Sequence, residues 1–393
     1  MEIWVYSRTL EKAGFAGGGA LSTEYTVKGL RERGHTVKTV GNLTELQHAL
    51  ATGKPDILVH HNTTDLETVQ ELAEQTKVPI AITVQIGLDC GTGLHVAFPA
   101  SEDSIWNEVA ELHFKKFGHL HTKCGLGMMM REMTVKKGNP LQKLKWVLEC
   151  PFRLARIRKR LGALEKADAV IAISPTIAEL LRENGVQRKI EGVPQPIDEK
   201  LFAVKKQAED KAKTKNVLFF GGMSWLKGAH VLLEAFSGVR DADARLWFAG
   251  PTEADFDERL VAEWKKGPHI EWLDLVDAAK ARELYRKADL VAFPSICVES
   301  FGRVWAEACA TGTPVIAFKG RGGAADFLEH GKTGWLCELS VESLRVGLET
   351  LLADEGLRQK LGKNANEMAL NKLHPKKIVE RLEKVYQTAC RSS

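Results

Sequence analysis

Short apolar runs alternate with amphipathic segments along most of the chain. The strand-like apolar runs lie at 2–6, 35–40, 56–60, 79–84, 167–174, 216–222, 244–250, 270–274, 289–295 and 314–318. The segments between them have helical periodicity, for example 21–33 and 65–76. An alternation of this kind predicts parallel β-sheets covered by helices. The fold class that we expect is therefore α/β.

The alternation is interrupted twice. Residues 88–140 carry glycines, histidines and three consecutive methionines, and a basic helix is expected at about 141–166. The segment 187–215 holds two prolines in "VPQPID" and then a charge run, which is typical of a linker. With 393 residues, two domains are expected. We place an N-terminal domain at 1–197 with a basic insertion at about 88–160, a C-terminal domain at 198–375, and a last helix at 376–393 that packs back on the N-terminal domain.

Composition narrows the setting of the protein. The chain has seven cysteines and no CxxC pair, which favours a reducing compartment. It shows no signal-peptide pattern and no apolar run of the ~18 residues that a bilayer span needs. We expect a cytoplasmic protein, with the inner face of a membrane as an alternative location.

The charge is unevenly spread. Between His113 and Arg160 the chain has thirteen Lys or Arg residues and two acids, a local charge of +11 against +4 for the whole chain. Within it, 143–161 alternates apolar and cationic residues at helical spacing, as amphipathic helices at membrane surfaces do. The readings left open are a solvated helix face, an anionic membrane surface and a polyanionic acceptor such as nucleic acid. The spacing of His113, His119, His121 and Cys124 matches no structural zinc pattern, and we expect no metal.

The segment "ESFGRVWAE" (299–307) follows a strand-like run and leads into a helix that is expected to begin near Gly302. The free N–H groups of such a helix end bind phosphate. Glu299 and Glu307 repel phosphate, so they suit the hydroxyls of sugars as hydrogen-bond acceptors. The alternative is that Glu307 only caps the helix and that Glu299 faces water. Lys227, after the glycine turn at 221–222, is a natural counter-charge for a diphosphate.

The order of these segments resembles the retaining glycosyltransferases of family 4, which have the GT-B fold. The family's C-terminal motif has two glutamates separated by seven residues, and the matching positions here are Pro294, Ser295, Glu299, Ser300, Phe301, Gly302, Glu307, Ala308, Gly312, Pro314, Val315 and Ile316. Gly323 and Asp326 fall where the family has a glycine pair and then an acid. The resemblance covers nearly the whole chain.

The resemblance implies two Rossmann-like domains whose parallel sheets face each other across a cleft. A UDP- or GDP-sugar would lie mainly on the C-terminal domain and a hydroxyl acceptor on the N-terminal one. Glu299 would bind the transferred sugar and Glu307 the ribose. The other donor-binding residues would be Gly18, Gly19, Gly222, Lys227, Ser300, Phe301 and Gly302. No cofactor and no metal are expected, and the leaving phosphate would help to deprotonate the acceptor. His60 and His61 end a strand near the cleft, where they would contact the acceptor or serve only as scaffold.

Two positions depart from the family. Gly222 stands where the family usually has arginine, and we expect Arg303 to supply the missing charge at the diphosphate; the alternative is a solvent-facing arginine. Gln85 stands where the family often has histidine; it can form hydrogen bonds at the catalytic centre but cannot act as a base. The leading expectation is an active retaining hexosyltransferase. The alternatives are a nucleotide-independent, phosphorylase-like relative, a pseudo-glycosyltransferase that only binds a glycan or nucleotide, and a glycosyltransferase directed at nucleic acid.

Overall fold

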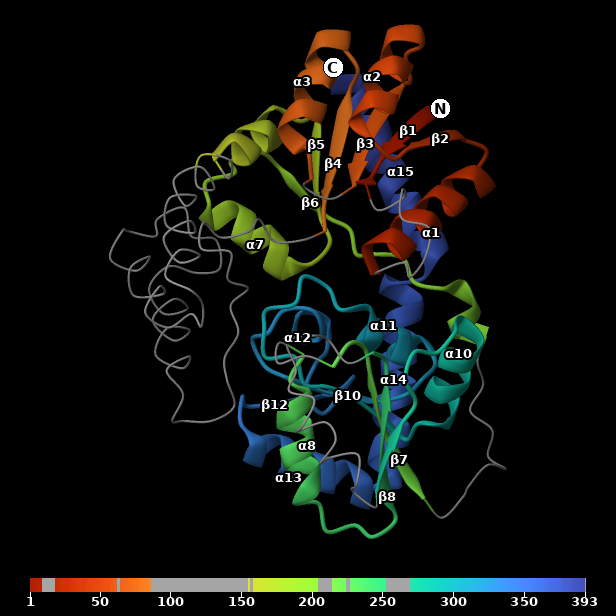
Figure 1. The fold of residues 1–393 in the computed structure, drawn as a ribbon, viewed down its shortest axis with the longest axis vertical. Helices are drawn as coiled ribbons and strands as arrows, with labels where there is room; N and C mark the ends of the chain where they lie inside the picture. The colour runs from red at the N-terminus through yellow and green to blue at the C-terminus, as the bar shows by residue number, and fades with distance from the viewer. Residues whose placement is uncertain are drawn as a thin grey trace, which may run out of the picture. The chain divides into compact units, whose positions relative to one another are not determined.

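The computed structural model describes residues 1–8, 18–61, 64–85, 155, 158–203, 214–223, 227–251 and 269–392 of the chain (Figure 1). They form two compact units. The first comprises the described residues up to Pro196 together with the C-terminal helix α15 (Pro375–Ser392), and the second comprises those from Ile197 to His374.

The first unit is built on a six-stranded parallel sheet in the order β2-β1-β3-β4-β5-β6. Its strands are β1 (Glu2–Tyr6), β2 (Thr36–Val40), β3 (Ile57–His61), β4 (Ile80–Val84), β5 (Ala169–Ala172) and β6 (Ile190–Gly192). Its helices include, besides α15, α1 (Gly18–Glu32), α2 (Leu43–Thr52), α3 (Leu66–Thr76) and α7 (Pro175–Glu183), and residues 158–166 are helical as well. Strands β3, β4 and β5 are buried along their whole length, which explains their nearly continuous apolar sequences.

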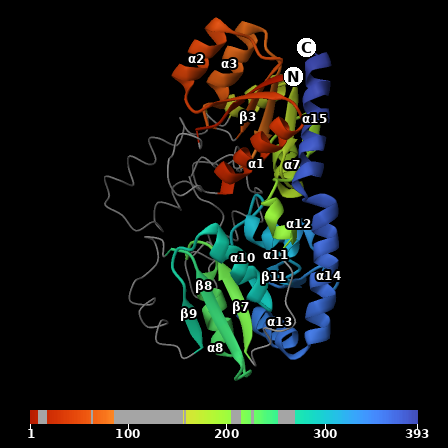
Figure 2. The same cartoon turned by 90° about the vertical axis from the view of Figure 1, so that its right-hand side faces the viewer.

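Helix α15 packs against α1 and along β3, β4 and β5 (Figure 2). A Cβ added to Gly29 of α1 would lie 2.5 Å from Cγ2 of Val379, so the glycine allows the two helices to approach closely. Glu383 of α15 forms an ion pair with Arg33 at 2.5 Å and hydrogen-bonds His35 Nε2 at 3.0 Å. The last helix of the chain therefore completes the core of the first unit.

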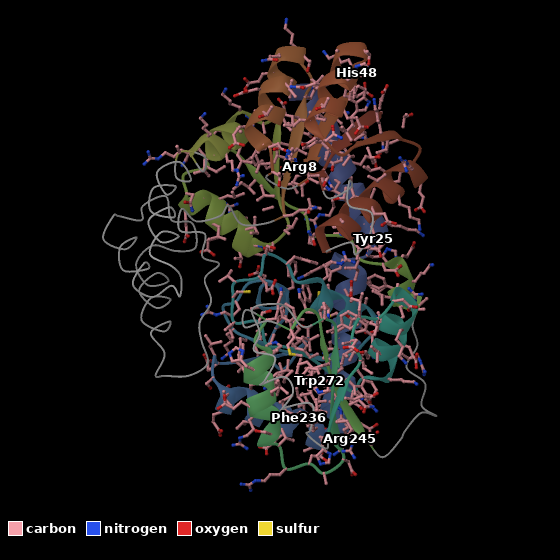
Figure 3. The ribbon with its side chains drawn as sticks, viewed as in Figure 1. Arg8, Tyr25, His48, Phe236, Arg245 and Trp272 are labelled. Carbon is pink, nitrogen blue, oxygen red and sulfur yellow. The ribbon has the colours of Figure 1, made fainter. Side chains whose placement is uncertain are left out.

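The second unit also has a six-stranded parallel sheet, in the order β12-β11-β10-β7-β8-β9. Its strands are β7 (Lys215–Phe220), β8 (Ala244–Ala249), β9 (Ile270–Trp272), β10 (Leu290–Phe293), β11 (Val315–Phe318) and β12 (Trp335–Cys337). Its helices are the 3-10 helix η2 (Glu199–Ala203), α8 (Ala229–Ser237), α10 (Ala278–Lys287), α11 (Arg303–Ala310), α12 (Ala324–Phe327), α13 (Val341–Ala353) and α14 (Glu355–Lys372). Phe236 of α8 belongs to its core, and Trp272 of β9 stacks on Phe248 (Figure 3).

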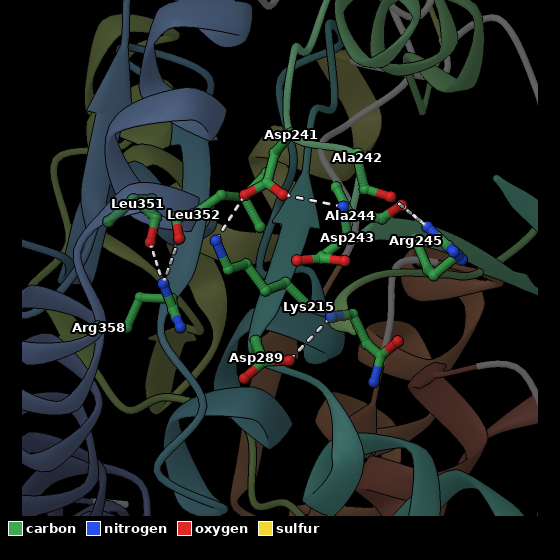
Figure 4. Close-up of polar contacts among 11 residues, drawn as sticks. Lys215, Asp241, Ala242, Asp243, Ala244, Arg245, Asp289, Leu351, Leu352 and Arg358 are labelled. Atoms are coloured by element: carbon green, nitrogen blue, oxygen red, sulfur yellow. Dashed lines mark hydrogen bonds and ion pairs between the residues drawn. The ribbon is translucent and has the colours of Figure 1, made fainter. Parts of the chain in front are cut away.

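Charged side chains form ion pairs and hydrogen bonds at the amino ends of the second unit's strands (Figure 4). Lys215, the first residue of β7, forms an ion pair of 2.6 Å with Asp241. Asp289, just before β10, accepts a hydrogen bond of 2.8 Å from the backbone N–H of Asn216. Arg358 is buried and donates to the carbonyls of the last turn of α13. These contacts satisfy backbone groups at the ends of elements.

The α/β fold with two parallel sheets is confirmed. The helix expected at 21–33 begins earlier than expected, because α1 starts at Gly18. Pattern reading also missed β6 and β12, which have three residues each, and α13 and α14. The basic stretch 113–160, including the four candidate zinc ligands, lies almost entirely outside the described residues. In the part of the chain that is described, no helix is long and apolar enough to cross a membrane.

Candidate functional site

The second sheet changes direction between β7 and β10. From β7 the chain proceeds to β8 and β9 on one side, whereas β10, β11 and β12 lie on the other. Ligands of open parallel sheets bind beyond the carboxyl ends of the strands at such a switch point. Lys227 follows β7 and Glu299 follows β10, so the connections from these two neighbouring strands carry the charged residues singled out in the sequence.

Glu299 collects several polar contacts although it is 8% exposed. Its Oε1 accepts hydrogen bonds from Lys227 Nζ at 2.5 Å and Ser295 Oγ at 2.7 Å, and the Cys297 thiol lies 3.9 Å away. The backbone N–H of Glu299 donates to the carbonyl of Arg321 at 2.8 Å, so the loop after β11 fixes its position. Glu299 therefore does not face water, and its negative charge is balanced by Lys227.

Two glycines let the connections approach one another at this end of the sheet. Gly228, next to Lys227, has φ +69°, and a Cβ there would lie 1.9 Å from the carbonyl oxygen of Pro294 after β10. Gly302 precedes α11 with φ +72°, and a Cβ there would lie 2.4 Å from the ring of Phe293. Both positions require glycine for conformation and for space. The first amides of α11 consequently start directly above the end of β10.

Glu307 lies in α11, and both of its carboxylate oxygens have protein partners. Oε1 accepts from Arg303 Nη2 at 3.0 Å, and Oε2 accepts from the Tyr285 hydroxyl at 2.9 Å. The Arg303 side chain is 10% exposed, so the alternative of a solvent-facing arginine is not met. Burial, and secondarily the charge of Glu307, raises the pKa of Tyr285 well above its usual value, so its hydroxyl stays protonated and donates.

The residues expected between the two acids differ in their surroundings. The side chain of Phe301 is buried against Trp305 and Phe327, so it belongs to the packing beneath the loop. Ser300 and Gly222 are partly exposed. The structure thus brings Lys227, Glu299, Ser300 and Gly302 to one end of the sheet. No described residues form a group of three or more His, Cys, Asp or Glu side chains suited to a metal ion.

In the first unit, the polar residues expected at the site gather under the start of α1. Gln85 Oε1 would lie 3.0 Å from a Cβ on Gly19, and the Gln85 amide nitrogen lies 3.5 Å from His61 Nδ1. Thr23 Oγ1 hydrogen-bonds the carbonyl of Gly19 and, at 3.0 Å, His61 Nδ1. Burial, with a smaller effect of the neighbouring histidine, lowers the pKa of His61 to about 3, so the ring is neutral at physiological pH. Gln85 and His61 therefore support the first turn of α1, where Gly18 begins the helix.

His60 is fully buried as well. Its Nε2 hydrogen-bonds the carbonyl of Thr64 at 2.8 Å, and its ring stacks on Tyr6 at 5.3 Å. The Tyr6 hydroxyl donates to Asp65, which also pairs with Arg8 at 2.5 Å. These contacts favour the scaffold role over the acceptor role that the sequence left open for the histidine pair. The contact of Arg8 with Asp65 was not expected. It joins the segments that follow β1 and β3, which are neighbours in the sheet but far apart in the sequence.

The comparison with protein families gives a match in the second unit. Residues 202–368 match the family described as Glycosyl transferases group 1. N-acetyl-alpha-D-glucosaminyl L-malate synthase of Bacillus anthracis is 29% identical over 243 residues, or 58% of this chain and 61% of that protein. D-inositol 3-phosphate glycosyltransferase of Corynebacterium glutamicum is 36% identical over 166 residues, or 40% of this chain and 39% of that protein. The chain thus spans about half the length of these relatives.

The likeness of fold extends beyond the residues of this family match. Anabaena Alr3699/HepE, in a structure with UDP-glucose, superposes with a TM-score of 0.70 at 17% identity and 98% coverage of each chain. Sucrose-phosphate synthase from Thermosynechococcus elongatus gives a TM-score of 0.72 at 19% identity and 100% coverage of each chain. At this identity the likeness concerns fold, and the fold of the chain is GT-B.

Proposed function

We propose that this protein transfers a sugar from a nucleoside-diphosphate donor to a hydroxyl acceptor with retention of the anomeric configuration, as in glycosyltransferase family 4. The observation that carries the proposal is the arrangement of side chains at the switch point of the second unit's sheet. There Lys227 forms an ion pair of 2.5 Å with Glu299, which is itself 8% exposed, close to the N-terminus of α11.

The donor is proposed to bind the second unit by its phosphates and hydroxyls. Lys227 and the amides after Gly302 offer positive charge and N–H donors to the diphosphate, which explains how the leaving group is stabilised without requiring a metal. Glu299 and Glu307 accept hydrogen bonds from hydroxyls, Glu299 from the transferred sugar and Glu307 from the ribose. Ser300 and Phe301 contribute backbone groups of the same loop. Lys227 donates a hydrogen bond to Glu299 in the structure. When the donor binds, the lysine therefore has to interact with both the carboxylate and the diphosphate.

The chemical step is proposed to take place on one face of the sugar. The bond between the anomeric carbon and the leaving phosphate oxygen breaks, and the acceptor oxygen forms its bond on the same face. The acceptor proton passes to the oxygen of the leaving phosphate, so no side-chain base is needed. The side chain of Gln85 is buried and cannot act as a base. This is consistent with a mechanism in which Gln85 supports the structure and does not transfer a proton.

The first unit is proposed to bind the acceptor, and the amides of Gly18 and Gly19 at the start of α1 are proposed to add N–H donors for the donor phosphates. A direct acceptor contact by His60 and His61 stays a prediction that their burial disfavours. An association of the basic stretch 113–160 with an anionic membrane surface also stays a prediction, to be tested by pelleting with vesicles that contain or lack anionic lipid.

The experiment is an assay for release of nucleoside diphosphate. The purified full chain is incubated with UDP-, GDP- or ADP-sugars and a panel of hydroxyl acceptors, and the Lys227→Met and Lys215→Met variants serve as a matched pair. The proposal predicts acceptor-dependent release that is strongly reduced by Lys227→Met and unchanged by Lys215→Met. Binding of a nucleoside diphosphate without release for any donor and acceptor would instead indicate a pseudo-glycosyltransferase.

A further inference from the structure

Arg303 occupies a position in α11 that helix stability does not explain. It is the first residue of the helix, where the helix dipole disfavours a cation. Its partner Glu307 follows four residues later, and this order of base and acid is the less favourable one for a helical pair. The ion pair nevertheless forms at 3.0 Å with both side chains largely buried. The pair therefore requires another explanation than the stability of α11.

The surroundings of Glu307 show what the pair achieves. One carboxylate oxygen accepts from Arg303 and the other from Tyr285, so each oxygen is held by a donor of its own. An ionised carboxylate has about four acceptor sites, so each oxygen keeps capacity for one ligand hydroxyl. Two adjacent hydroxyls, such as the 2′- and 3′-hydroxyls of ribose, can be met by the two oxygens together.

Tyr285 is itself firmly placed. It is 1% exposed, its ring stacks on Phe220 at 5.5 Å, and its carbonyl accepts a hydrogen bond of 2.8 Å from Thr313 Oγ1. Phe220 is the last residue of β7, which lies at the switch point of the sheet. The hydroxyl that faces Glu307 thus belongs to a side chain with little freedom to turn away.

We propose that Arg303 and Tyr285 act as positioning residues that hold the Glu307 carboxylate in one orientation and so give the protein its preference for ribose over deoxyribose in the bound nucleotide. The inference rests on the proposed function, because it takes Glu307 as the ribose acceptor. In this proposal Arg303 acts on Glu307, whereas the sequence led us to expect it at the diphosphate. Without Arg303, the largely buried carboxylate loses its compensating charge and one of its two fixed directions.

The test measures binding rather than turnover. The probes are UDP, GDP and ADP, each with its 2′-deoxy form, titrated calorimetrically into the full chain. The variants are Arg303→Met, Arg303→Lys and Tyr285→Phe. Arg345→Met is the matched control, because Arg345 forms the same kind of pair with Glu349 four residues later on α13, at 2.7 Å. Circular dichroism checks that each variant is folded.

We expect the wild type to bind one nucleoside diphosphate about tenfold more tightly than its 2′-deoxy form. Arg303→Met and Tyr285→Phe should bring this ratio close to one, mainly by weakening the ribose form, and Arg345→Met should leave it unchanged. Arg303→Lys should fall between, because an ammonium lacks the planar geometry of guanidinium. If Arg303→Met does not fold, the ratio for Tyr285→Phe decides.

Three results would overturn the inference while leaving the proposed function intact. They are a wild type that binds without ribose preference, a preference that persists in folded Arg303→Met and Tyr285→Phe, and an equal weakening of both nucleotide forms in Arg303→Met. The last would return Arg303 to the diphosphate. If none of the three nucleoside diphosphates binds the wild type, the proposed function fails and the inference fails with it.

Discussion

The two ends of the second unit's sheet carry similar charged pairs in different settings. At the amino end, Lys215 and Asp241 lie 2.6 Å apart, and at the carboxyl end Lys227 and Glu299 lie 2.5 Å apart. At the amino end, Asp241 also accepts from a backbone N–H, at Asp243 (Figure 4). At the carboxyl end, Glu299 accepts from the side chains of Lys227 and Ser295, near the start of α11.

The difference indicates which charges stabilise the unit and which are held ready for a ligand. Charged side chains at the ends of strands and helices form hydrogen bonds with backbone groups that would otherwise have no partner. A carboxylate that is 8% exposed and paired with a lysine costs desolvation without completing any element. We therefore expect substitutions of the charged residues at the amino end to change stability. Substitutions of the charged residues at the carboxyl end should change binding and turnover.

The largest expected effect concerns the two carboxylates. Glu299→Gln keeps the shape of the side chain but removes its charge, so we expect kcat to fall by about 100–1,000-fold, in the range seen when one stabilising contact to a transition state is lost. Asp241→Asn should leave kcat unchanged. Steady-state kinetics of the two variants decide, and equal activity of Glu299→Gln and wild type would remove the distinction between the two ends.

The lysines give the second contrast. Lys227→Met removes a charge-assisted contact to phosphate, and we expect it to weaken nucleoside-diphosphate binding by about 10–100-fold. Lys215→Met should bind as the wild type does. The affinities come from titration with UDP, GDP and ADP at constant salt. A loss of affinity of the same size in both variants would point to a general effect of net charge.

The glycines sharpen the comparison in terms of stability. Gly302 and Gly331 both have φ +72°, but a Cβ would meet Phe293 at 2.4 Å in the first and nothing within 4 Å in the second. We expect Gly302→Ala to lower the free energy of unfolding by about 2 kcal/mol more than Gly331→Ala, because the first adds a clash to a shared conformational cost. Urea unfolding followed by tryptophan fluorescence measures the difference. Equal losses would show that the ring of Phe293 yields without cost.

The smallest effect is a dependence of stability on pH at the amino end. The hydrogen bond from Lys215 holds the pKa of Asp241 below its usual value. A depressed carboxyl pKa stabilises the folded state above the unfolded pKa, and this contribution is lost as pH falls through the folded pKa. We expect Asp241→Asn to be less stable than the wild type by about 1 kcal/mol at pH 7, with the gap closing below about pH 4. A gap of the same size at pH 3 as at pH 7 would assign the effect to hydrogen bonding alone.

Much of this arrangement could be predicted from local pattern. Buried parallel strands have nearly continuous apolar sequences, so β3, β4, β7 and β10 were placed within a few residues. The short strands β6 and β12 have three residues each, too few to establish a period. The start of α1 was placed late because glycines are typical of turns, although the first turn of a helix tolerates them.

At the site, spacing located Glu299 and Glu307 but did not reveal their partners. The contact between Lys227 and Glu299 joins positions 72 residues apart, and it depends on β7 and β10 being neighbours in the sheet. Tyr285 lies in an amphipathic helix, where a tyrosine is usually part of the core. The pairing of Arg303 with Glu307 did have a signal, a spacing of four residues within one helix.

The most direct test of the central claim is amide hydrogen exchange with and without nucleoside diphosphate. The first amides of a helix have no partner within it, so a phosphate bound there should slow their exchange. The account predicts that whichever of UDP, GDP and ADP binds will protect peptides covering 300–306 and leave those covering 214–218 and 241–245 unchanged. Protection confined to the amino end, or to the first unit, would contradict it.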